Sequence, residues 1–542
     1  MKRRHFLGSV LGGALLPVTA SNAAENAASV SFKHGVASGD PTADAVVIWT
    51  RVSGCANDFG EVRWKVASDP AMQKVLKRGR ARTGVFRDYT VKVDVTGLPS
   101  GAELFYQFEA DGCDNTAVQS PVGRTRTLPT GTLAAARFAV VSCANYPYGY
   151  FHVYREIANR DDLDAVIHLG DYLYEYGMGE YATERAEELG RVPEPAGETV
   201  SLADLRTRHA QYKTDPDLQA LHAAHPLIAV WDDHELANNA WRDGAQNHQG
   251  EEGDWPSRRD AAIQAWLEWM PVRVNHEQGH TRIYRKFDYG DLLSLVMLDT
   301  RLVGRDLQPD EGPGVTAESV GAAMRDPKRR LLGARQESWL RETLVSSKAT
   351  WQVLGQQVMM LPALSPDLEP LLDLALDSMV PIEQLQQYIA LSKNNPPMIL
   401  DTWNGYPVAR QQLLAELAEY ARNPIVLSGD LHTSMAGDLY LNGRDKPVSV
   451  EFMTGSVSSP GFAEYLPENR PGAVRDATLA INPMMKYIET DRRGWLLLSL
   501  TPERCLGEWH LLNSVHTKAY TVSIDKRLFV RAGHVSDGLQ EG

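Results

Sequence analysis

Two patterns of hydrophobic and polar positions divide the chain near residue 130. Before that point, apolar residues either form short runs, as over residues 45–49, or alternate with polar ones, as over residues 91–95. Turns that contain Gly and Pro, such as residues 99–101, separate these segments. Period-two alternation interrupted by tight turns is typical of antiparallel strands. The pattern therefore predicts an N-terminal β-sandwich of the Ig/fibronectin-like kind over residues 30–130.

After a Pro-Thr-Gly-Thr linker at residues 129–132, short apolar runs alternate with helical patterns. The predicted strands are residues 138–142, 165–169, 227–231, 292–298, 351–354 and 424–428. The predicted helices include residues 155–159, 261–269 and 409–421. Strands that alternate with helices favour a layered α/β domain. We place this domain at residues 134–510 and a C-terminal tail at residues 511–542.

Charge and composition restrict the possible partners. The 542 residues include 69 acidic and 55 basic side chains, a formal net charge of −14, and 43% are hydrophobic. The hydrophobic content is that of a globular protein. An acidic surface lacks the positive charge that drives binding to phosphate polymers, which excludes a nucleic-acid packaging role. The same acidity favours bound cations. The sequence does not decide whether Cys55 and Cys113 form a disulfide.

The N-terminus has the pattern of an export signal. Basic residues at positions 2–4 precede an apolar run over residues 6–18, which is too short to cross a bilayer. We therefore expect residues 1–24 to be a removable signal peptide. The pair Arg3-Arg4 resembles the twin-arginine signal, which predicts export by the twin-arginine machinery to the periplasm or the medium. A chance basic start is the alternative. No later apolar run is long enough to predict a transmembrane segment.

Four of the predicted strands run directly into chemically reactive side chains. These are Cys143 and Asn145, then Asp171 and Tyr174, then Asp233 and His234, and finally Asp430 and His432. Ligands of α/β sheets bind at the carboxyl ends of the strands, so we expect these side chains to share one site. Carboxylates suit hard cations such as Ca²⁺, whereas thiolate, phenolate and imidazole suit iron or zinc. The mixed set predicts a site for more than one kind of metal.

The order of these motifs resembles that of the calcineurin-like metallophosphoesterases. Gly170, Asp171 and Tyr174 match the Gly-Asp-Xaa-Xaa-Tyr motif of the purple acid phosphatase branch. Three other motifs depart from the common pattern. Cys143-Ala144-Asn145 replaces Asp-Xaa-His, Asp233-His234-Glu235 replaces Asn-His-Glu, and Asp430-Leu431-His432 replaces His-Xaa-His. With segments 35–41, 298–301 and 403–407, this set resembles the alkaline phosphatase D (PhoD) family from about residue 30 to beyond 460.

The resemblance implies a secreted, metal-dependent alkaline phosphatase or phosphodiesterase that hydrolyses phosphate monoesters and diesters by metal-activated hydroxide. It implies that Fe³⁺ is bound by Cys143, Asp171, Tyr174 and His432. It further implies that Asp171 bridges to Ca²⁺, with Asp233 and Asp430 as oxygen ligands and Asn239 as a further candidate.

The resemblance also suggests roles for residues outside the ligand set. His234 is the expected proton donor or stabiliser on the leaving-group side, and Asn145 is expected to hydrogen-bond the phosphate. Arg301 is either a phosphate contact or a salt-bridge partner. Asn404 stands where the family pattern has Asp, so the sequence does not decide whether this position contacts calcium.

Two alternative functions remain at the level of sequence. The first is a phospholipase D-type phosphodiesterase, which the same family resemblance covers. The second belongs to a different class: a non-catalytic protein whose β-sandwich binds a surface while the α/β domain is inert.

Overall fold

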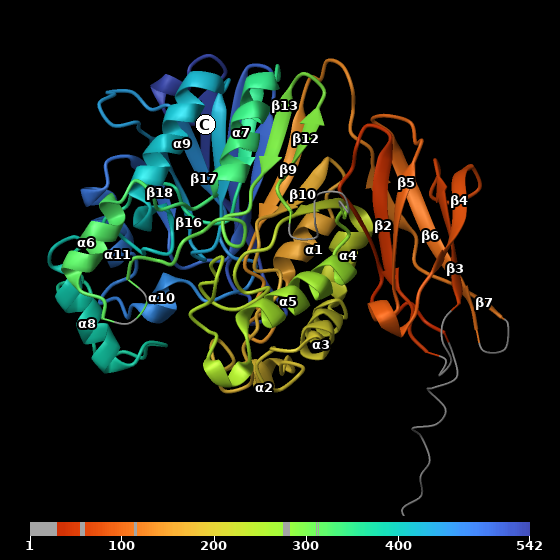
Figure 1. Cartoon of the computed structure of the whole chain (residues 1–542), viewed down its shortest axis with the longest axis horizontal. Helices are drawn as coiled ribbons and strands as arrows, with labels where there is room; N and C mark the ends of the chain where they lie inside the picture. The colour runs from red at the N-terminus through yellow and green to blue at the C-terminus, as the bar shows by residue number, and fades with distance from the viewer. Residues whose placement is uncertain (1–29, 55–59, 113–115, 275–281, 311, 313) are drawn as a thin grey trace, which may run out of the picture.

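A computed structural model describes residues 30–54, 60–112, 116–274, 282–310, 312 and 314–542. The expected signal peptide at residues 1–24 and the cysteines Cys55 and Cys113 lie outside the described residues. Within the described ranges, no helix combines the length and the apolar character that a membrane span requires. Figure 1 shows the N-terminal strands packed beside a larger α/β body.

The N-terminal domain is a β-sandwich. One layer contains β1 (Val36–Gly39), β2 (Ala45–Arg51) and β5 (Thr90–Thr96). The other contains β3 (Glu61–Ala67), β4 (Val75–Arg82), β6 (Glu103–Asp111), β7 (Ala117–Gln119) and β8 (Gly123–Arg126). Inward-facing side chains of both layers, among them Ile48, Val62 and Phe108, form one core. Because successive side chains of a strand point to opposite faces, this core produces the period-two pattern of the sequence.

A ten-stranded sheet runs through both domains in the order β22-β21-β20-β19-β9-β10-β11-β1-β2-β5. At its centre β9 (Ala136–Val141), β10 (Ala165–His168) and β11 (Pro226–Ala229) are parallel. The strand β1 extends the sheet by pairing in parallel with β11 through Ser38 and Gly39. The sandwich and the α/β body therefore share one network of backbone hydrogen bonds.

The segment 511–542, for which the sequence predicts a C-terminal tail, contributes two further strands to the same sheet. After β19 (Gly494–Leu500) and β20 (Arg504–Leu512), β21 (Val522–Arg531) pairs with β20 along its length, and β22 (Gln540–Glu541) pairs with β21. Only a few side chains of β21, such as Leu528 and Val530, are buried. A strand with so few apolar positions gives a weak sequence signal.

A seven-stranded sheet packs on the first and follows the order β12-β13-β14-β15-β17-β16-β18. Its strands are β12 (Arg285–Tyr289), β13 (Leu293–Met297), β14 (Trp351–Gly355), β15 (Pro424–Ser428), β16 (Ser434–Leu439), β17 (Ser449–Met453) and β18 (Met485–Glu489). Leu295 and Met297 join the core shared by the two sheets, whereas Val296 packs in the core under the outer helices. Both faces of β13 are thus buried, as its continuous apolar run indicates.

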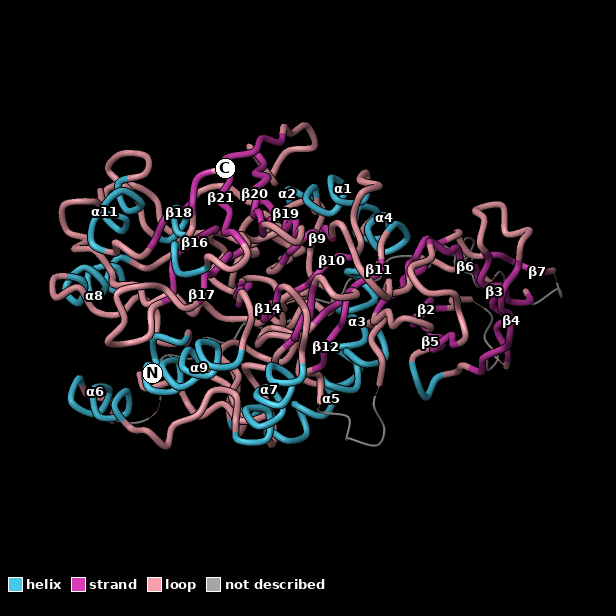
Figure 2. The backbone as a smooth tube through the Cα atoms, turned by 90° about the horizontal axis from the view of Figure 1, so that it is seen from above, coloured by secondary structure: helices cyan, strands magenta, loops and turns pink. Residues whose placement is uncertain are grey.

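Helices cover the outer faces of the two sheets (Figure 2). On one side lie α1 (His152–Ala158) and α4 (Pro216–Ala224), and on the other α7 (Ala334–Ser346) and α9 (Pro407–Tyr420). The remaining helices are α2 (Ala186–Leu189), α3 (Leu202–Tyr212), α5 (Trp255–Trp269), α6 (Ala317–Arg325), α8 (Ile382–Ser392), α10 (Phe462–Tyr465) and α11 (Ala473–Ile481).

Local sequence explains where α5 begins. The helix starts at Trp255, before the predicted residue 261, because the Asp254 carboxylate accepts the backbone N–H of Ser257 at 3.0 Å and Pro256 lies in the first turn. The strand predicted at residues 424–428 is confirmed as β15. The protein is therefore an N-terminal β-sandwich joined to a layered α/β domain.

Candidate metal centre

The chain turns sharply at the carboxyl ends of β9, β10 and β15. Cys143, Asp171, Asp430 and His432 all have positive φ, at 62°, 54°, 70° and 58°, and Asn239 has φ 52°. A left-handed backbone at a non-glycine residue costs on the order of 1 kcal/mol or more and persists where the surroundings enforce it. Strained residues often cluster at functional sites, and here five of them are residues that the sequence singled out.

Close packing of these turns requires glycine at two positions. A Cβ atom on Gly170 would lie 2.4 Å from Cβ of Asp232, and one on Gly429 would lie 2.5 Å from Oγ of Ser142. The Gly-Asp pairs of the sequence thus bring the loops after β9, β10, β11 and β15 into contact, because only glycine allows so close an approach.

One group of side chains gathers around Asp171. Sγ of Cys143 lies 3.4 Å from Oδ2 of Asp171, and the hydroxyl of Tyr174 lies 3.4 Å from the same oxygen. The Tyr174 hydroxyl is also 2.9 Å from Nε2 of His432. Ligand atoms of Cys143, Asp171 and His432 lie within 4.8 Å of one another, a spacing that fits one bound cation.

The imidazole of His432 is oriented for ligation through Nε2. Its Nδ1–H donates to the carbonyl of Pro460 at 2.7 Å, which directs Nε2 towards Tyr174. Burial lowers the pKa of His432 to about 3, so the ring is neutral. A neutral ring whose second nitrogen is hydrogen-bonded to a carbonyl is the usual form of a metal-bound histidine.

A second group consists of carboxylates. Asp171, Asp232, Asp233 and Asp430 offer oxygens that lie within 4.8 Å of one another. Oδ2 of Asp233 accepts the backbone N–H of Asn239 at 2.6 Å. Among the described residues, Oδ1 of Asp171 and Oδ1 of Asp233 are buried and have no hydrogen-bond partner. Buried carboxylate oxygens are rarely left without a donor, so Oδ1 of Asp171 fits a site for cations, whereas Oδ1 of Asp233 lies 3.5 Å from the guanidinium of Arg301.

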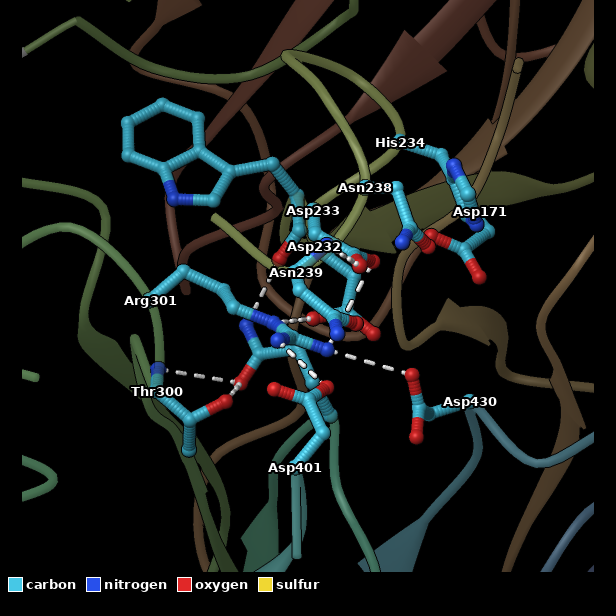
Figure 3. Close-up of polar contacts among 12 residues, drawn as sticks. Asp171, Asp232, Asp233, His234, Asn238, Asn239, Thr300, Arg301, Asp401 and Asp430 are labelled. Atoms are coloured by element: carbon cyan, nitrogen blue, oxygen red, sulfur yellow. Dashed lines mark hydrogen bonds and ion pairs between the residues drawn. The ribbon is translucent and has the colours of Figure 1, made fainter. Parts of the chain in front are cut away.

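Arg301 lies among these carboxylates (Figure 3). Its guanidinium is 2.7 Å from Asp401, 3.1 Å from Asp430 and 3.5 Å from Asp233, and it also forms a pair with Asp232. Of the two roles that the sequence left open for Arg301, the structure shows the salt-bridge partner.

The pKa values follow from burial and from this arginine. Burial raises the pKa of Asp171 and of Asp430 well above the ordinary value for aspartate. Burial also acts on Asp233, but the charges of Arg301 and His234 outweigh it and lower its pKa to about 2. Burial raises the pKa of Cys143 and of Tyr174. These carboxyl, thiol and phenol groups can all be ionised at the same time only if a cation lies among them.

His234 is held by a buried glutamate that sequence reasoning missed. Nδ1–H of His234 donates to Oε2 of Glu175 at 2.7 Å. Burial alone would lower the pKa of His234, but Glu175, Asp233 and Asp171 together raise it well above the ordinary value. The centres of the His234 and Tyr174 rings lie 4.2 Å apart, with the two planes tilted by 32°. Glu175 is part of the segment after β10 that supplies Asp171, and this shared segment was the available signal.

Glu235 and Asp401 are two further residues to which the sequence assigned no role. The Glu235 carboxylate accepts the backbone N–H groups of Tyr172 at 2.7 Å, Asp232 at 2.8 Å and Asp171 at 3.1 Å. It therefore ties the loop after β10 to the loop after β11. Asp401 follows none of the predicted strands, so no local pattern distinguished it.

The three asparagines that the sequence singled out, Asn145, Asn239 and Asn404, differ in their surroundings. Oδ1 of Asn145 accepts the backbone N–H of Tyr148 at 3.1 Å, which leaves its NH₂ group as a donor. Asn239 lies beside Asp233, as Figure 3 shows. Oδ1 of Asn404 accepts from Arg410 at 2.9 Å, and the carboxylate on that loop that approaches Arg301 is instead Asp401.

Carboxylates, imidazoles, a thiol and a phenol meet at the strand ends of a layered α/β fold, an arrangement that suits a metal-dependent hydrolase. The family model of the PhoD-like phosphatases matches residues 138–509, and the family model of their N-terminal domain matches residues 18–129. The chain belongs to the PhoD-like phosphatase family and is a phosphoric ester hydrolase that binds metal.

Relatives agree with this assignment. The chain is 32% identical over 518 residues to alkaline phosphatase D of Bacillus subtilis (strain 168), covering 93% of this chain and 81% of that protein. A solved structure described as "Structure of PhoD" aligns with a TM-score of 0.78 and 31% identity, over 94% of this chain and 92% of that one.

A more distant solved structure shares the fold alone. Purple acid phosphatase PPD1 from yellow lupin seeds aligns with a TM-score of 0.53 at 11% identity, covering 91% of this chain and 74% of its own. Membership in a family of phosphatases favours an enzyme over the surface-binding alternative.

Proposed function

We propose that the chain is an exported alkaline phosphatase and phosphodiesterase with a mixed iron–calcium centre. In this proposal Cys143, Asp171, Tyr174 and His432 hold Fe³⁺, and Asp171, Asp233 and Asp430 hold Ca²⁺ with Asn239 nearby. The observation that carries it is that a thiol and a phenol contact Asp171, while an imidazole contacts the phenol and lies close enough to share one cation with the thiol and Asp171. This donor set suits iron, whereas the adjacent carboxylates suit Ca²⁺.

The two cations would activate a water molecule and neutralise charge on the phosphoryl oxygens. The protein would supply the remaining groups. His234, protonated through its contact with Glu175, would give a proton to the leaving oxygen. The free NH₂ group of Asn145 would donate to a phosphoryl oxygen. The substrates would be phosphate monoesters and diesters.

The proposal includes the organisation and the compartment of the chain. Residues 1–24 would direct export through the twin-arginine machinery to the periplasm or the medium, ahead of a sandwich at 30–130 and a catalytic domain from 134. Lys in place of both Arg3 and Arg4 should retain the protein in the cytoplasm, as cell fractionation would show. Unchanged export of that variant would contradict this part of the proposal.

Metal analysis of the purified protein tests the centre, paired with assays on para-nitrophenyl phosphate and bis-para-nitrophenyl phosphate with and without Ca²⁺. We expect iron near one per chain, hydrolysis that depends on Ca²⁺, and a visible absorption band from the ferric–phenolate bond. The variant Asp171→Ala should lose both iron and hydrolysis.

An iron-free protein that stays active, or an Asp171→Ala variant that keeps both iron and activity, would refute the assignment. The two esters also separate the phosphodiesterase alternatives, since hydrolysis of the diester alone would favour a phospholipase D-type preference.

A further inference from the structure

Arg301 connects four carboxylates that come from different parts of the chain. It follows β13, whereas Asp232 and Asp233 follow β11, Asp430 follows β15, and Asp401 precedes the 3₁₀ turn Trp403–Gly405. The Arg301 side chain has no exposed surface. Figure 3 shows Asp232, Asp401 and Asp430 on different sides of the guanidinium.

Neighbouring groups fix this arginine in place. The backbone N–H of Arg301 donates to Oδ1 of Asp299 at 2.9 Å. Arg305, also fully buried, pairs with the Asp401 carboxylate that contacts Arg301. The guanidinium is therefore held in one position. The arginine of a surface ion pair, by contrast, can move.

The buried carboxylates around Arg301 outnumber the buried guanidinium groups. Two guanidinium groups face four carboxylates, and Asp171 adds a fifth beside them, so negative charge remains in excess, as a site for a bound cation requires. Without Arg301, one more negative charge would be buried at the same place. Buried like charges are strongly destabilising unless a cation compensates them.

We propose that Arg301 is a built-in counter-cation of the second metal site. It binds one oxygen of Asp430 and lies beside one oxygen of Asp233, so that both carboxylates stay assembled when Ca²⁺ is absent. Arg301 is in this view a positioning residue, and its consequence is a fold that does not depend on Ca²⁺. The inference rests on the proposed function, because it takes Asp233 and Asp430 as calcium ligands.

Thermal unfolding in EGTA and in excess Ca²⁺ tests the inference on the full chain. The variants are Arg301→Met, which removes the charge, and Arg301→Lys, which keeps the charge but not the planar fork. The matched control is Arg285→Met, because Arg285 forms a pair with the buried carboxylate of Asp40 at 2.6 Å outside the site.

We expect Arg301→Met to have a reduced Tm in EGTA, and Ca²⁺ to raise its Tm by on the order of 5–10 °C more than in the parent chain. Arg301→Lys should give an intermediate rise, since an ammonium group cannot contact four carboxylates. Arg285→Met should be destabilised equally in both media.

Three results would overturn the inference: a rise for Arg301→Met no larger than for Arg285→Met, an equal loss of Tm in both media, or a rise for Arg301→Lys as large as for Arg301→Met, which would show that the charge plays no part. If Arg301→Met cannot be isolated, Arg301→Gln takes its place as the variant without the charge. Calorimetric titration of the parent with Ca²⁺ separates the two proposals. A parent that binds no Ca²⁺ contradicts the proposed function, whereas one that binds Ca²⁺ leaves the test of Arg301 valid.

Discussion

The pair of Glu175 and His234 determines how the candidate proton donor titrates. A raised pKa keeps His234 protonated to higher pH, so the negative charge of Glu175 extends proton donation towards alkaline conditions. Replacing Glu175 by Gln removes the largest of the charges that raise the pKa of His234 and therefore lowers that pKa. We expect kcat to fall by about 10- to 100-fold and the alkaline limb of the pH profile to move to lower pH.

The pH dependence of kcat for Glu175→Gln checks this prediction. The matched control is Glu198→Gln, since Glu198 pairs with Arg258 and not with His234. An alkaline limb that stays in place in Glu175→Gln, or that moves equally in the control, would contradict a role of Glu175 through His234.

At the scale of elements, Glu235 joins the loops after β10 and β11. Three backbone N–H groups donate to this one buried carboxylate. Glu235→Ala should lower the free energy of unfolding by about 3–5 kcal/mol and also release metal, because three buried donors lose their acceptor next to Asp171. Urea unfolding and elemental analysis measure the two effects.

Glu451 offers a matched control for that variant. It is a buried glutamate that accepts from the backbone N–H groups of Met360 and Leu361 and from Ser428. Glu451→Ala should be similarly destabilised and keep its metal. Loss of metal in Glu451→Ala, or retention in Glu235→Ala, would show that Glu235 acts on stability alone.

The strand β21 protects the edge of the ten-stranded sheet. A chain that ends after Leu512 would leave β20 as an exposed edge, since β21 pairs with it along its length. An uncovered edge strand promotes aggregation. We expect this truncated chain to be largely insoluble, as measured by sedimentation and light scattering. A chain that ends after Arg531 keeps β21 and should remain soluble.

At the scale of the whole molecule, we expect the sandwich and the α/β body to unfold as one cooperative unit. They share the pairing of β1 with β11, and Trp49 packs with Trp269 of α5 in a separate buried cluster. Calorimetry should therefore show a single unfolding transition, because neither domain can unfold without exposing the other. Two transitions, or a stable folded chain of residues 134–542, would contradict this expectation.

Local sequence was sufficient to predict the elements that place the site. Continuous apolar runs marked the parallel strands, and the polar residues after them marked Cys143, Asp171, Asp233 and Asp430. The period-two pattern indicated the sandwich. These features are local, because a few neighbouring residues determine both whether a strand is buried and where a turn ends it.

Only the tertiary structure decided which groups face one another. Nothing near Asp401 in the sequence indicates that it meets Arg301, and the pairing of β1 with β11 joins residues that are far apart in the chain. Nor could the sequence identify β21 as the strand that covers β20. Such contacts depend on how whole sheets and loops pack. A sequence pattern shows which residues of a segment are buried, but not which other segment buries them.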